Sequence, residues 1–395
     1  MAGKKGAPSG AKAKTNKTNN KKPQQKKTQP PVSSRDTQDE PDQKQGLSDD
    51  DRRHQQRALD VFRHAFNEVL SSSELTTTLQ SVKQALYDRD FARAFGDPDH
   101  LAVYAARWSP TRALCYASVL EGIREHLEPL SLPSPANTTK NDDDGNETGT
   151  APSDDAKSLR QLKILSIGGG AAELVAFGAF LNQHPSPLSG SITLLDSGPW
   201  ETVITKLTTA LTTPPPISKY ASEAAKLSNA AMVPPSYLTP TFLQQDAVTL
   251  DRDILPSLLG TTTPLLVTIL FTLNELFTAS GIGKTTAFLL NLTATIPFGS
   301  LLLVVDSPGS YSETTIGKEA KRYPMRWLLD RVLLATRREP VNGRRWTKVE
   351  SHESVWFRLA SDGLDYPIAL ENMRYQMHLY RTEDAALEDG EDDDD

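Results

Sequence analysis

The middle of the chain alternates between two hydrophobic patterns: short apolar runs, and longer segments with apolar residues at helical spacing. The short runs predict strands and the longer segments predict helices. Strands are predicted at residues 162–167, 191–195, 242–245, 265–271 and 300–305, and helices at 171–181, 201–211, 285–295 and 322–334. Because the two alternate, we expect a parallel sheet with helices on both faces. Strands at 355–359 and 374–380 would add an antiparallel edge pair, giving a seven-stranded, doubly wound α/β sheet.

The chain before the first predicted strand has apolar positions such as Leu59, Phe62 and Phe66 at helical spacing. We therefore predict a helical extension over residues 53–130, ahead of a Rossmann-like domain over residues 159–381. Three other segments contain few large apolar side chains, so they cannot bury enough surface to offset the entropy of ordering. These are a disordered basic tail, a disordered linker and a disordered acidic tail, predicted over residues 1–52, 131–158 and 382–395.

Charge is unevenly distributed along the chain, whose net charge is −7. Lysines gather between Lys4 and Lys27, whereas acidic runs lie at residues 142–144 and 391–395. A basic arm can contact nucleic acid, serve as a nuclear or nucleolar address, or keep the chain in solution. Composition leaves these roles open.

The sequence gives no sign of a metal site or a membrane span. Cys115 is the single cysteine, and the seven histidines are scattered rather than set at ligand spacing, so we expect no metal. His352 and His378 fall in or near the predicted edge strands, where a surface position is the default. The longest apolar run, residues 265–273, is too short to cross a bilayer, so we expect no membrane partner.

Three glycines, Gly168, Gly169 and Gly170, follow the first predicted strand directly and precede a helix. Glycines let the backbone approach a ligand, and a helix N-terminus presents free N–H groups. A dinucleotide loop needs glycine or alanine at its sixth position, but this chain has Glu173 there. A carboxylate repels a pyrophosphate but tolerates S-adenosylmethionine, which carries an ammonium and a sulfonium. An ordinary strand–helix turn is the alternative interpretation.

A second glycine segment, residues 281–286, superficially resembles a phosphate-binding P-loop. That motif requires glycine at position 278, where this chain has Thr278. The segment also does not follow its strand directly. We therefore interpret it as a helix start with Gly281 and Gly283 in the turn.

Polar residues follow four further predicted strands. Ligands bind such sheets at the carboxyl ends of the strands. If the ligand is S-adenosylmethionine, Asp196 can accept from both ribose hydroxyls and Asp246 from the adenine amine. Asn274 and Glu275 would then lie over the methyl group, with Asp306 at the next strand end. An Asp after a strand is also a common cap or turn residue, and this alternative is strongest for Asp246 and Asp306.

Several motifs together resemble the fungal family of S-adenosylmethionine-dependent methyltransferases that includes a nucleolar enzyme for N3 of a uridine in large-subunit rRNA. The resemblance covers residues 59–381. The motifs are Trp108-Ser109-Pro110-x-Arg112-Ala113-Leu114-x-Tyr116, Leu165 to Gly170 with Glu173-Leu174-Val175-Ala176, Asp196 with Trp200, Phe271-Thr272-x-Asn274-Glu275-Leu276, Asp306 to Tyr311, Trp356-Phe357-Arg358, and Glu371 to Gln376. One departure from methyltransferases in general is Ser166, where an acidic residue is common.

The resemblance implies a class I, Rossmann-like fold, S-adenosyl-L-methionine as cofactor, and methylation of rRNA or a pre-ribosomal particle in the nucleus and nucleolus. The glycine loop and the strand ends themselves predict the cofactor contacts, which are Gly168, Gly169, Gly170, Glu173, Asp196 and Asp246. Uracil N3 carries a proton, so a base would help. Glu275 is our first candidate and Asp306 the second, while Asn274 can hold the base edge.

Aromatic side chains can stack on a uridine that is splayed out of structured RNA. Trp108, Trp200 and Tyr311 are candidates for this contact, and Arg112 lies in the same motif as Trp108. For Trp327 and Trp356 we instead expect core packing.

Two other functions remain open, because a site at the end of a sheet does not name its substrate. The fold could methylate a protein or a small molecule. It could also bind the cofactor without catalysis, as a ribosome-assembly factor held by its basic arm.

Overall fold

The computed structural model describes residues 48–133, 159–260, 262–309, 311–316, 319–359 and 363–387, with backbone alone for 311–322. Most of the predicted tails and linker lies outside these residues. The helical extension begins at Asp49, four residues before the predicted start at residue 53. Its first helix, α1 (Asp49–Ala65), is capped by Ser48, whose side chain accepts a hydrogen bond from the Asp51 N–H. The Rossmann-like domain also ends later than predicted. Strand β10 continues to Asp384, three residues into the segment predicted to be an acidic tail.

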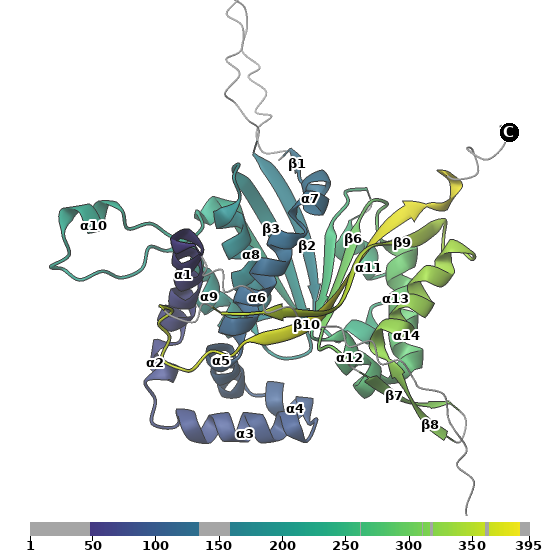
Figure 1. The fold of residues 1–395 in the computed structure, drawn as a ribbon, viewed down its shortest axis with the longest axis horizontal. Helices are drawn as coiled ribbons and strands as arrows, with labels where there is room; N and C mark the ends of the chain where they lie inside the picture. The colour runs from purple at the N-terminus through teal and green to yellow at the C-terminus, as the bar shows by residue number, and fades with distance from the viewer. Residues whose placement is uncertain are drawn as a thin grey trace, which may run out of the picture. The chain divides into compact units, whose positions relative to one another are not determined.

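The core of the described chain is one sheet with the strand order β4-β3-β2-β5-β6-β10-β9 (Figure 1). Neighbours from β4 to β6 pair in parallel, and β10 runs antiparallel to both β6 and β9. These seven strands confirm the predicted doubly wound sheet with its closing pair. The strands are β2 (Arg160–Ile167), β3 (Leu188–Asp196), β4 (Leu238–Gln244), β5 (Leu266–Leu270), β6 (Leu301–Asp306), β9 (Arg344–Phe357) and β10 (Met373–Asp384).

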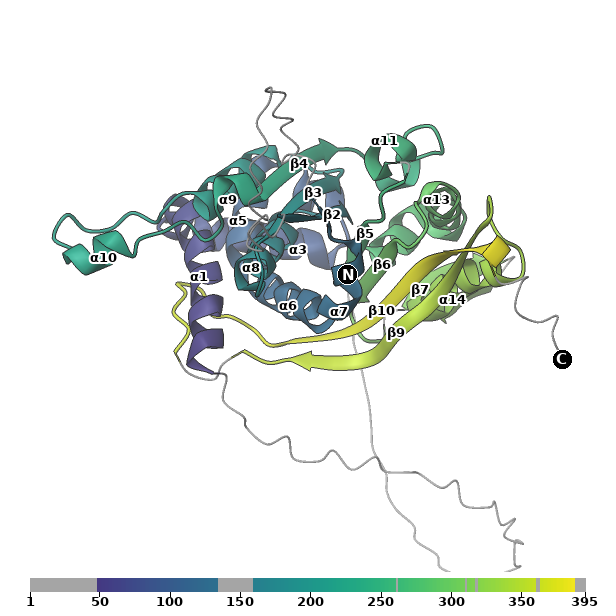
Figure 2. The ribbon, with the colours of Figure 1, turned by 90° about the horizontal axis from the view of Figure 1, so that it is seen from above.

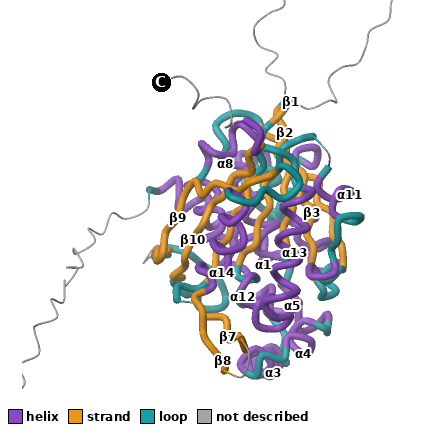
Figure 3. Tube along the Cα trace, turned by 90° about the vertical axis from the view of Figure 1, so that its right-hand side faces the viewer, coloured by secondary structure: helices purple, strands orange, loops and turns teal. Residues whose placement is uncertain are grey.

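Three short strands add to the predicted pattern. Strand β1 (Leu132–Pro133) pairs antiparallel with the first residues of β2 and makes an eighth strand of the sheet. Strands β7 (Tyr311–Ile316) and β8 (Glu319–Pro324) form a separate antiparallel pair, which lies apart from the main sheet in Figure 3. Because β8 extends to Pro324, the helix predicted from residue 322 begins only at Met325. A residue before proline favours extended backbone.

Helices cover both faces of the sheet (Figure 2). One core cluster joins α1, α6, α8 and α9 to one face, and a second joins α11, α13 and α14 to the other. None of the helices in the described chain is long and apolar enough to cross a membrane. The remaining helix bounds are α2 (Asn67–Leu70), α3 (Leu75–Tyr87), α4 (Phe91–Phe95), α5 (Pro98–Arg107), α6 (Ser109–Gly122), α7 (Arg124–Leu127), α8 (Ala171–Gln183), α9 (Glu201–Thr212), α10 (Glu223–Leu227), α11 (Leu255–Leu259), α12 (Leu273–Glu275), α13 (Gly281–Thr295) and α14 (Met325–Leu333).

Three side-chain placements predicted from the sequence are wrong. His378 is fully buried, because β10 is an inner strand between β6 and β9 and the His378 ring is enclosed by neighbours that include Ser351 and Gln376, with which its nitrogens hydrogen-bond. Trp327 and Trp356 are 45% and 53% exposed instead of packed in the core. An arginine guanidinium lies against each ring, Arg331 on Trp327 and Arg374 on Trp356. His352 lies at the surface as expected.

Candidate functional site

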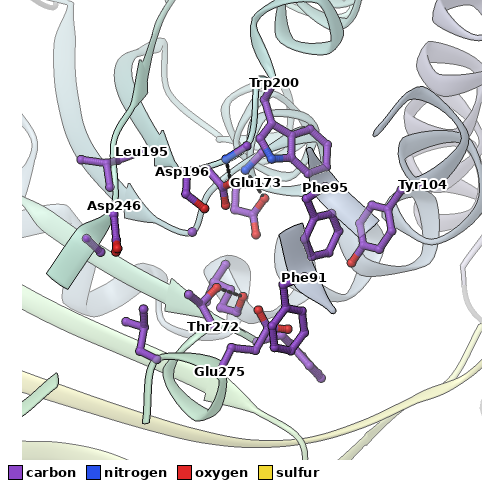
Figure 4. A pocket seen from close by; sticks show the side chains of 18 of the residues that line it. Phe91, Phe95, Tyr104, Glu173, Leu195, Asp196, Trp200, Asp246, Thr272 and Glu275 are labelled. Atoms are coloured by element: carbon purple, nitrogen blue, oxygen red, sulfur yellow. Dashed lines mark hydrogen bonds between the residues drawn. The ribbon is translucent and has the colours of Figure 1, made fainter. Parts of the chain in front are cut away.

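A cavity of about 470 Å³ lies at the carboxyl ends of β2, β3, β4 and β5 (Figure 4). Its floor is formed by the loops that follow these strands. Its other wall comes from the helical extension, through α4, α5 and the start of α6. The extension is therefore part of the site and not merely attached to the domain. Figure 4 shows carboxylates from the sheet side and aromatic rings from the extension side pointing into the same space.

The glycine loop forms the middle of this floor. Gly168 has φ +69, and a Cβ there would lie 2.3 Å from Thr272 Oγ1, so only glycine fits. A Cβ on Gly170 would come within 3.1 Å of the Trp200 ring. Gly168 and Gly170 line the cavity, whereas Gly169 does not.

Glu173 has a structural role that the sequence analysis missed. It occupies the third position of α8, and its Oε2 accepts a hydrogen bond of 2.8 Å from the Gly170 N–H. This capping arrangement fixes the end of the glycine loop against the helix. The carboxylate also lines the cavity, where burial raises its pKa to about 7. A buried carboxylate at this position favours a cationic ligand group.

The ends of β3 and β4 bring Asp196 and Asp246 into the same cavity. Asp196 Oδ1 accepts from the Gly198 N–H at 2.7 Å, and burial raises the pKa of this carboxyl to about 6. Asp246 is exposed, and its Oδ1 accepts from the Val248 N–H at 3.1 Å. Asp246 is thus a turn residue, as the alternative interpretation held, and also part of the cavity wall.

The ends of β5 and β6 place their polar residues differently. Glu275 lines the cavity, and burial raises its pKa to about 7 although the Arg112 guanidinium opposes the shift. Asn274 and Asp306 do not line it. Asp306 is 4% exposed, and its Oδ2 and Oδ1 accept from the Asn274 and Ser307 N–H groups at 3.1 and 2.7 Å. Its carboxylate holds the two strand ends together.

Arg112 reaches the cavity from α6, between two aromatic side chains. Its Nη1 donates to the Tyr104 hydroxyl at 2.5 Å, and its guanidinium carbon lies 5.2 Å from the Phe271 ring centroid. Phe271 has φ +55, a conformation that costs a bulky residue free energy. The fold holds this aromatic ring in place despite the backbone strain.

The cavity wall also contains Phe91, Phe95 and Phe271, which were not predicted from the sequence. Phe271 could have been found from the sequence, because it directly follows a fully buried strand. Phe91 and Phe95 lie in a short helix, and no sequence pattern there points to the site. Trp108 does not line the cavity but packs against Tyr104, with ring centroids 5.2 Å apart. The backbone of Tyr311 lies in β7, and its side chain is outside the described part of the structure.

S-adenosylmethionine fits this set of residues on two structural observations. The buried indole N–H of Trp200 lies near Asp196 but completes no hydrogen bond within the described residues, so an acceptor on a ligand would satisfy it. The glycine loop packs so closely on Thr272 and Trp200 that a Cβ at Gly168 or Gly170 would meet them, and this packing brings the backbone of both glycines to the cavity wall. Carboxylates around this space match an ammonium and a sulfonium.

Two other binding chemistries find no support in the described residues. No group of three or more His, Cys, Asp or Glu side chains there could hold a metal ion. Residues 281–286 form the first turns of α13 after a π-helical segment, Leu276–Ser280, so they are a helix start. Gly281, with φ +80, makes the bend, while Gly283 lies inside the helix and not in the turn.

A family model and a yeast protein, both of methyltransferases, match this chain. Residues 62–381 match the model of a family described as "Putative SAM-dependent methyltransferase". The chain is similar to the 25S rRNA (uridine(2843)-N(3))-methyltransferase of Saccharomyces cerevisiae, with 31% identity over 82% of this chain and 85% of that protein.

Two solved structures are more distantly similar. The 16S rRNA (adenine(1408)-N(1))-methyltransferase from Catenulisporales acidiphilia is 14% identical, covering 56% of this chain and 88% of that one, with a TM-score of 0.33. The plantazolicin methyltransferase BpumL in complex with SAH is 12% identical, covering 77% and 99%, with a TM-score of 0.34. The family assignment rests on the family model and the yeast relative.

Proposed function

This chain belongs to the family of S-adenosylmethionine-dependent methyltransferases, and we propose that its substrate is N3 of a uridine in large-subunit rRNA. The observation that carries the proposal is Glu275, a half-buried carboxyl with a pKa of about 7 in the wall of the cavity. A base with a pKa near the working pH suits removal of the N3 proton. The yeast relative is an rRNA uridine-N3 methyltransferase.

The sheet side of the cavity would hold the cofactor, whose sulfonium supplies an electrophilic methyl group. Asp196 would accept from the ribose hydroxyls and Asp246 from the adenine amine. Glu173 would face the ammonium of the methionine part, next to Gly168 and Gly170. Many methyltransferases have an acidic residue at the position that Ser166 occupies here. Ser166 is 1% exposed and accepts a hydrogen bond from Thr268, so it does not reach the cofactor. Glu173 would make the ammonium contact in its place.

Glu275 and Arg112 would then act on the uracil. Glu275 would accept the N3 proton as the methyl group passes from the sulfonium sulfur to N3, which leaves a neutral thioether, and it would later release that proton to water. Negative charge develops on the uracil carbonyl oxygens during this step, and the Arg112 guanidinium can stabilise it. Arg112 is already oriented by the Tyr104 hydroxyl and the Phe271 ring.

The extension side of the cavity would hold the splayed base. Phe91, which lines the cavity with Glu275, is better placed to stack on uracil than Trp108, which packs outside the cavity wall. Asn274 would help to position the neighbouring Glu275, because the Asn274 backbone N–H donates a hydrogen bond to Asp306. Because Asp306 accepts this hydrogen bond, we propose that it positions the end of β5 and does not act as a base.

The setting we propose is the nucleus and nucleolus, with a pre-ribosomal particle as the partner. The lysine-rich arm between Lys4 and Lys27 supports this setting because it is an electrostatic handle for RNA. The rRNA substrate of the yeast relative supports it as well.

The test is deletion of the gene, followed by mass spectrometry of rRNA nucleosides. Loss of one N3-methyluridine, restored by the wild-type chain but not by Glu275→Gln, is the expected result. Unchanged rRNA with a lost protein or metabolite mark would move the substrate elsewhere. Unchanged marks of every kind, with defective ribosome assembly, would make the chain a non-catalytic factor.

A further inference from the structure

We propose that Gln376 is a positioning residue for methyl transfer, because a buried chain of hydrogen bonds leads from its side chain to the turn that carries Glu275. This inference rests on the proposed function, in which Glu275 is the base. Gln376 is the last residue of the Glu371–Gln376 motif, which takes no part in the cavity wall. The residue would therefore act through its neighbours and not by touching the substrate.

Gln376 holds the chain directly after β6. It lies on β10, where it is 5% exposed, and its register partner is Asp306, the last residue of β6. The Gln376 Nε2 donates to the backbone carbonyl oxygen of Ser307 at 2.8 Å. Because leaving a buried amide donor unpaired costs free energy, this hydrogen bond ties the first residue beyond β6 to the neighbouring strand.

The hydrogen bonds continue from Ser307 to the turn after β5. The Ser307 N–H donates to Asp306 Oδ1 at 2.7 Å, and Oδ2 of the same carboxylate accepts from the Asn274 N–H at 3.1 Å. Asn274 directly precedes Glu275 in the short helix α12. The two ends of this chain are therefore Gln376 on β10 and the backbone beside Glu275, with the Asp306 carboxylate between them.

His378 determines which way the Gln376 amide points. Because Gln376 Nε2 donates to Ser307, its Oε1 is the atom that faces His378 Nε2, at 3.1 Å. Oε1 can only accept, so His378 Nε2 carries the proton, and Nδ1 of the neutral ring accepts from Ser351 Oγ at 2.8 Å. Burial lowers the pKa of His378 to about 4, which keeps the ring neutral at physiological pH. A flipped amide would set its NH₂ group against the imidazole N–H.

The turn that carries Glu275 is short, so its position depends on contacts with the strand ends. Helix α12 has three residues, and the π-helical segment Leu276–Ser280 follows it directly. A base must lie within hydrogen-bond reach of the proton that it removes, and a shift of about 1 Å can lower a rate by about 10²-fold. Gln376 would therefore affect the reaction by fixing where the Glu275 carboxyl lies.

The same strand offers a matched control. Thr382 lies six residues further along β10, so its side chain points to the same face of the sheet as that of Gln376. It is 1% exposed, and its Oγ1 donates to the Pro297 carbonyl oxygen at 2.9 Å, in the segment before β6. Thr382→Val therefore removes a comparable buried hydrogen bond at the opposite end of β6, away from the cavity.

The experiment compares full-length wild type, Gln376→Met and Thr382→Val. Methionine is unbranched and close to glutamine in length, but it cannot donate to Ser307. The substrate is large-subunit rRNA, or pre-ribosomal particles, from cells that lack the gene. The measurements are kcat, the KM for RNA, the cofactor Kd by calorimetric titration, and unfolding in denaturant.

We expect both variants to unfold at lower denaturant concentration, but only Gln376→Met to lower kcat, by roughly tenfold. The KM for RNA and the cofactor Kd should stay within about twofold of wild type. The loss of kcat should be partial, because the Phe271 N–H also joins these strand ends by donating to the Val305 carbonyl oxygen at 2.7 Å.

A double variant tests the path through Asp306. If Gln376 acts through this carboxylate, Gln376→Met should lower kcat by less than about twofold when it is added to Asp306→Ala. Losses that multiply, as they do for independent sites, would contradict the path. If a variant at Gln376 fails to fold, His378→Leu decides: it should lower kcat with an unchanged KM, and a kcat equal to wild type would count against the proposal.

Equal kcat in wild type and Gln376→Met would overturn the positioning role while leaving the proposed function standing. An equal fall of kcat in Gln376→Met and Thr382→Val would also overturn it, because the loss would then follow stability alone. A wild-type chain that methylates no RNA would instead remove the proposed function.

Discussion

The ends of β5 and β6 lie side by side and each carries a carboxylate, yet the two groups have different environments. Glu275 faces the cavity with a raised pKa, and the contributions to that shift are burial, Arg112 and neighbouring acids. Asp306 accepts two backbone N–H groups and does not face the cavity. Asp306 therefore links two strand ends, whereas the Glu275 carboxyl faces the space that a ligand would fill.

The sharpest test of this difference is Glu275→Gln. It keeps the size of the side chain but removes the base, so we expect kcat to fall by about 10²–10⁴. Cofactor affinity, measured by calorimetric titration, should stay within about twofold of wild type. Asp306→Asn is the matched control, because its remaining carbonyl oxygen can still accept hydrogen bonds. A larger loss of kcat in Asp306→Asn would reverse the two roles.

A third strand end extends the comparison to cofactor binding. We expect Asp196→Ala to abolish measurable cofactor binding, a loss of about 100-fold or more, because two hydrogen bonds to a charged acceptor disappear together. The readout is the same titration. Affinity equal to wild type would remove Asp196 from the site, and Asp246→Ala should have a smaller effect because that side chain is exposed.

Asp306 should matter more for folding than for chemistry. Asp306→Ala leaves the Asn274 and Ser307 N–H groups without this acceptor, which costs about 1–3 kcal/mol for a fully buried group and less for these part-buried ones. We expect a lower free energy of unfolding in denaturant titrations and a smaller loss of kcat than in Glu275→Gln. Unchanged stability would show that the two N–H groups find water or other acceptors.

The pH dependence tests the same carboxyl without a mutation. Below a pKa of about 7, Glu275 is protonated, so kcat/KM should rise about tenfold per pH unit and level off above it. For stability the sign is opposite. Because burial raises this pKa, the folded state favours the protonated form, and the free energy of unfolding should fall between about pH 4.5 and 7. Glu275→Gln should flatten both profiles, and an unchanged rate profile would assign the titration to another group.

The order of strands and helices, and the polar residues at the strand ends, could be predicted because both depend on local patterns. Asp196, Asp246 and Glu275 reach one cavity for that reason. The separate role of Asp306 could not be predicted, since it depends on two peptide N–H groups, one of them from the neighbouring strand end. His378 shows the same limit, because its burial depends on the place of β10 inside the sheet and on the side chains that enclose the ring.

Phe271 has a consequence for how this chain tolerates change. Its backbone conformation is one that glycine or asparagine adopts more readily, while its ring supports Arg112. A library randomised at this position and selected for thermal stability should therefore enrich glycine or asparagine. The same library selected for methylation should keep phenylalanine. Stability and activity would thus be selected in opposite directions at one residue.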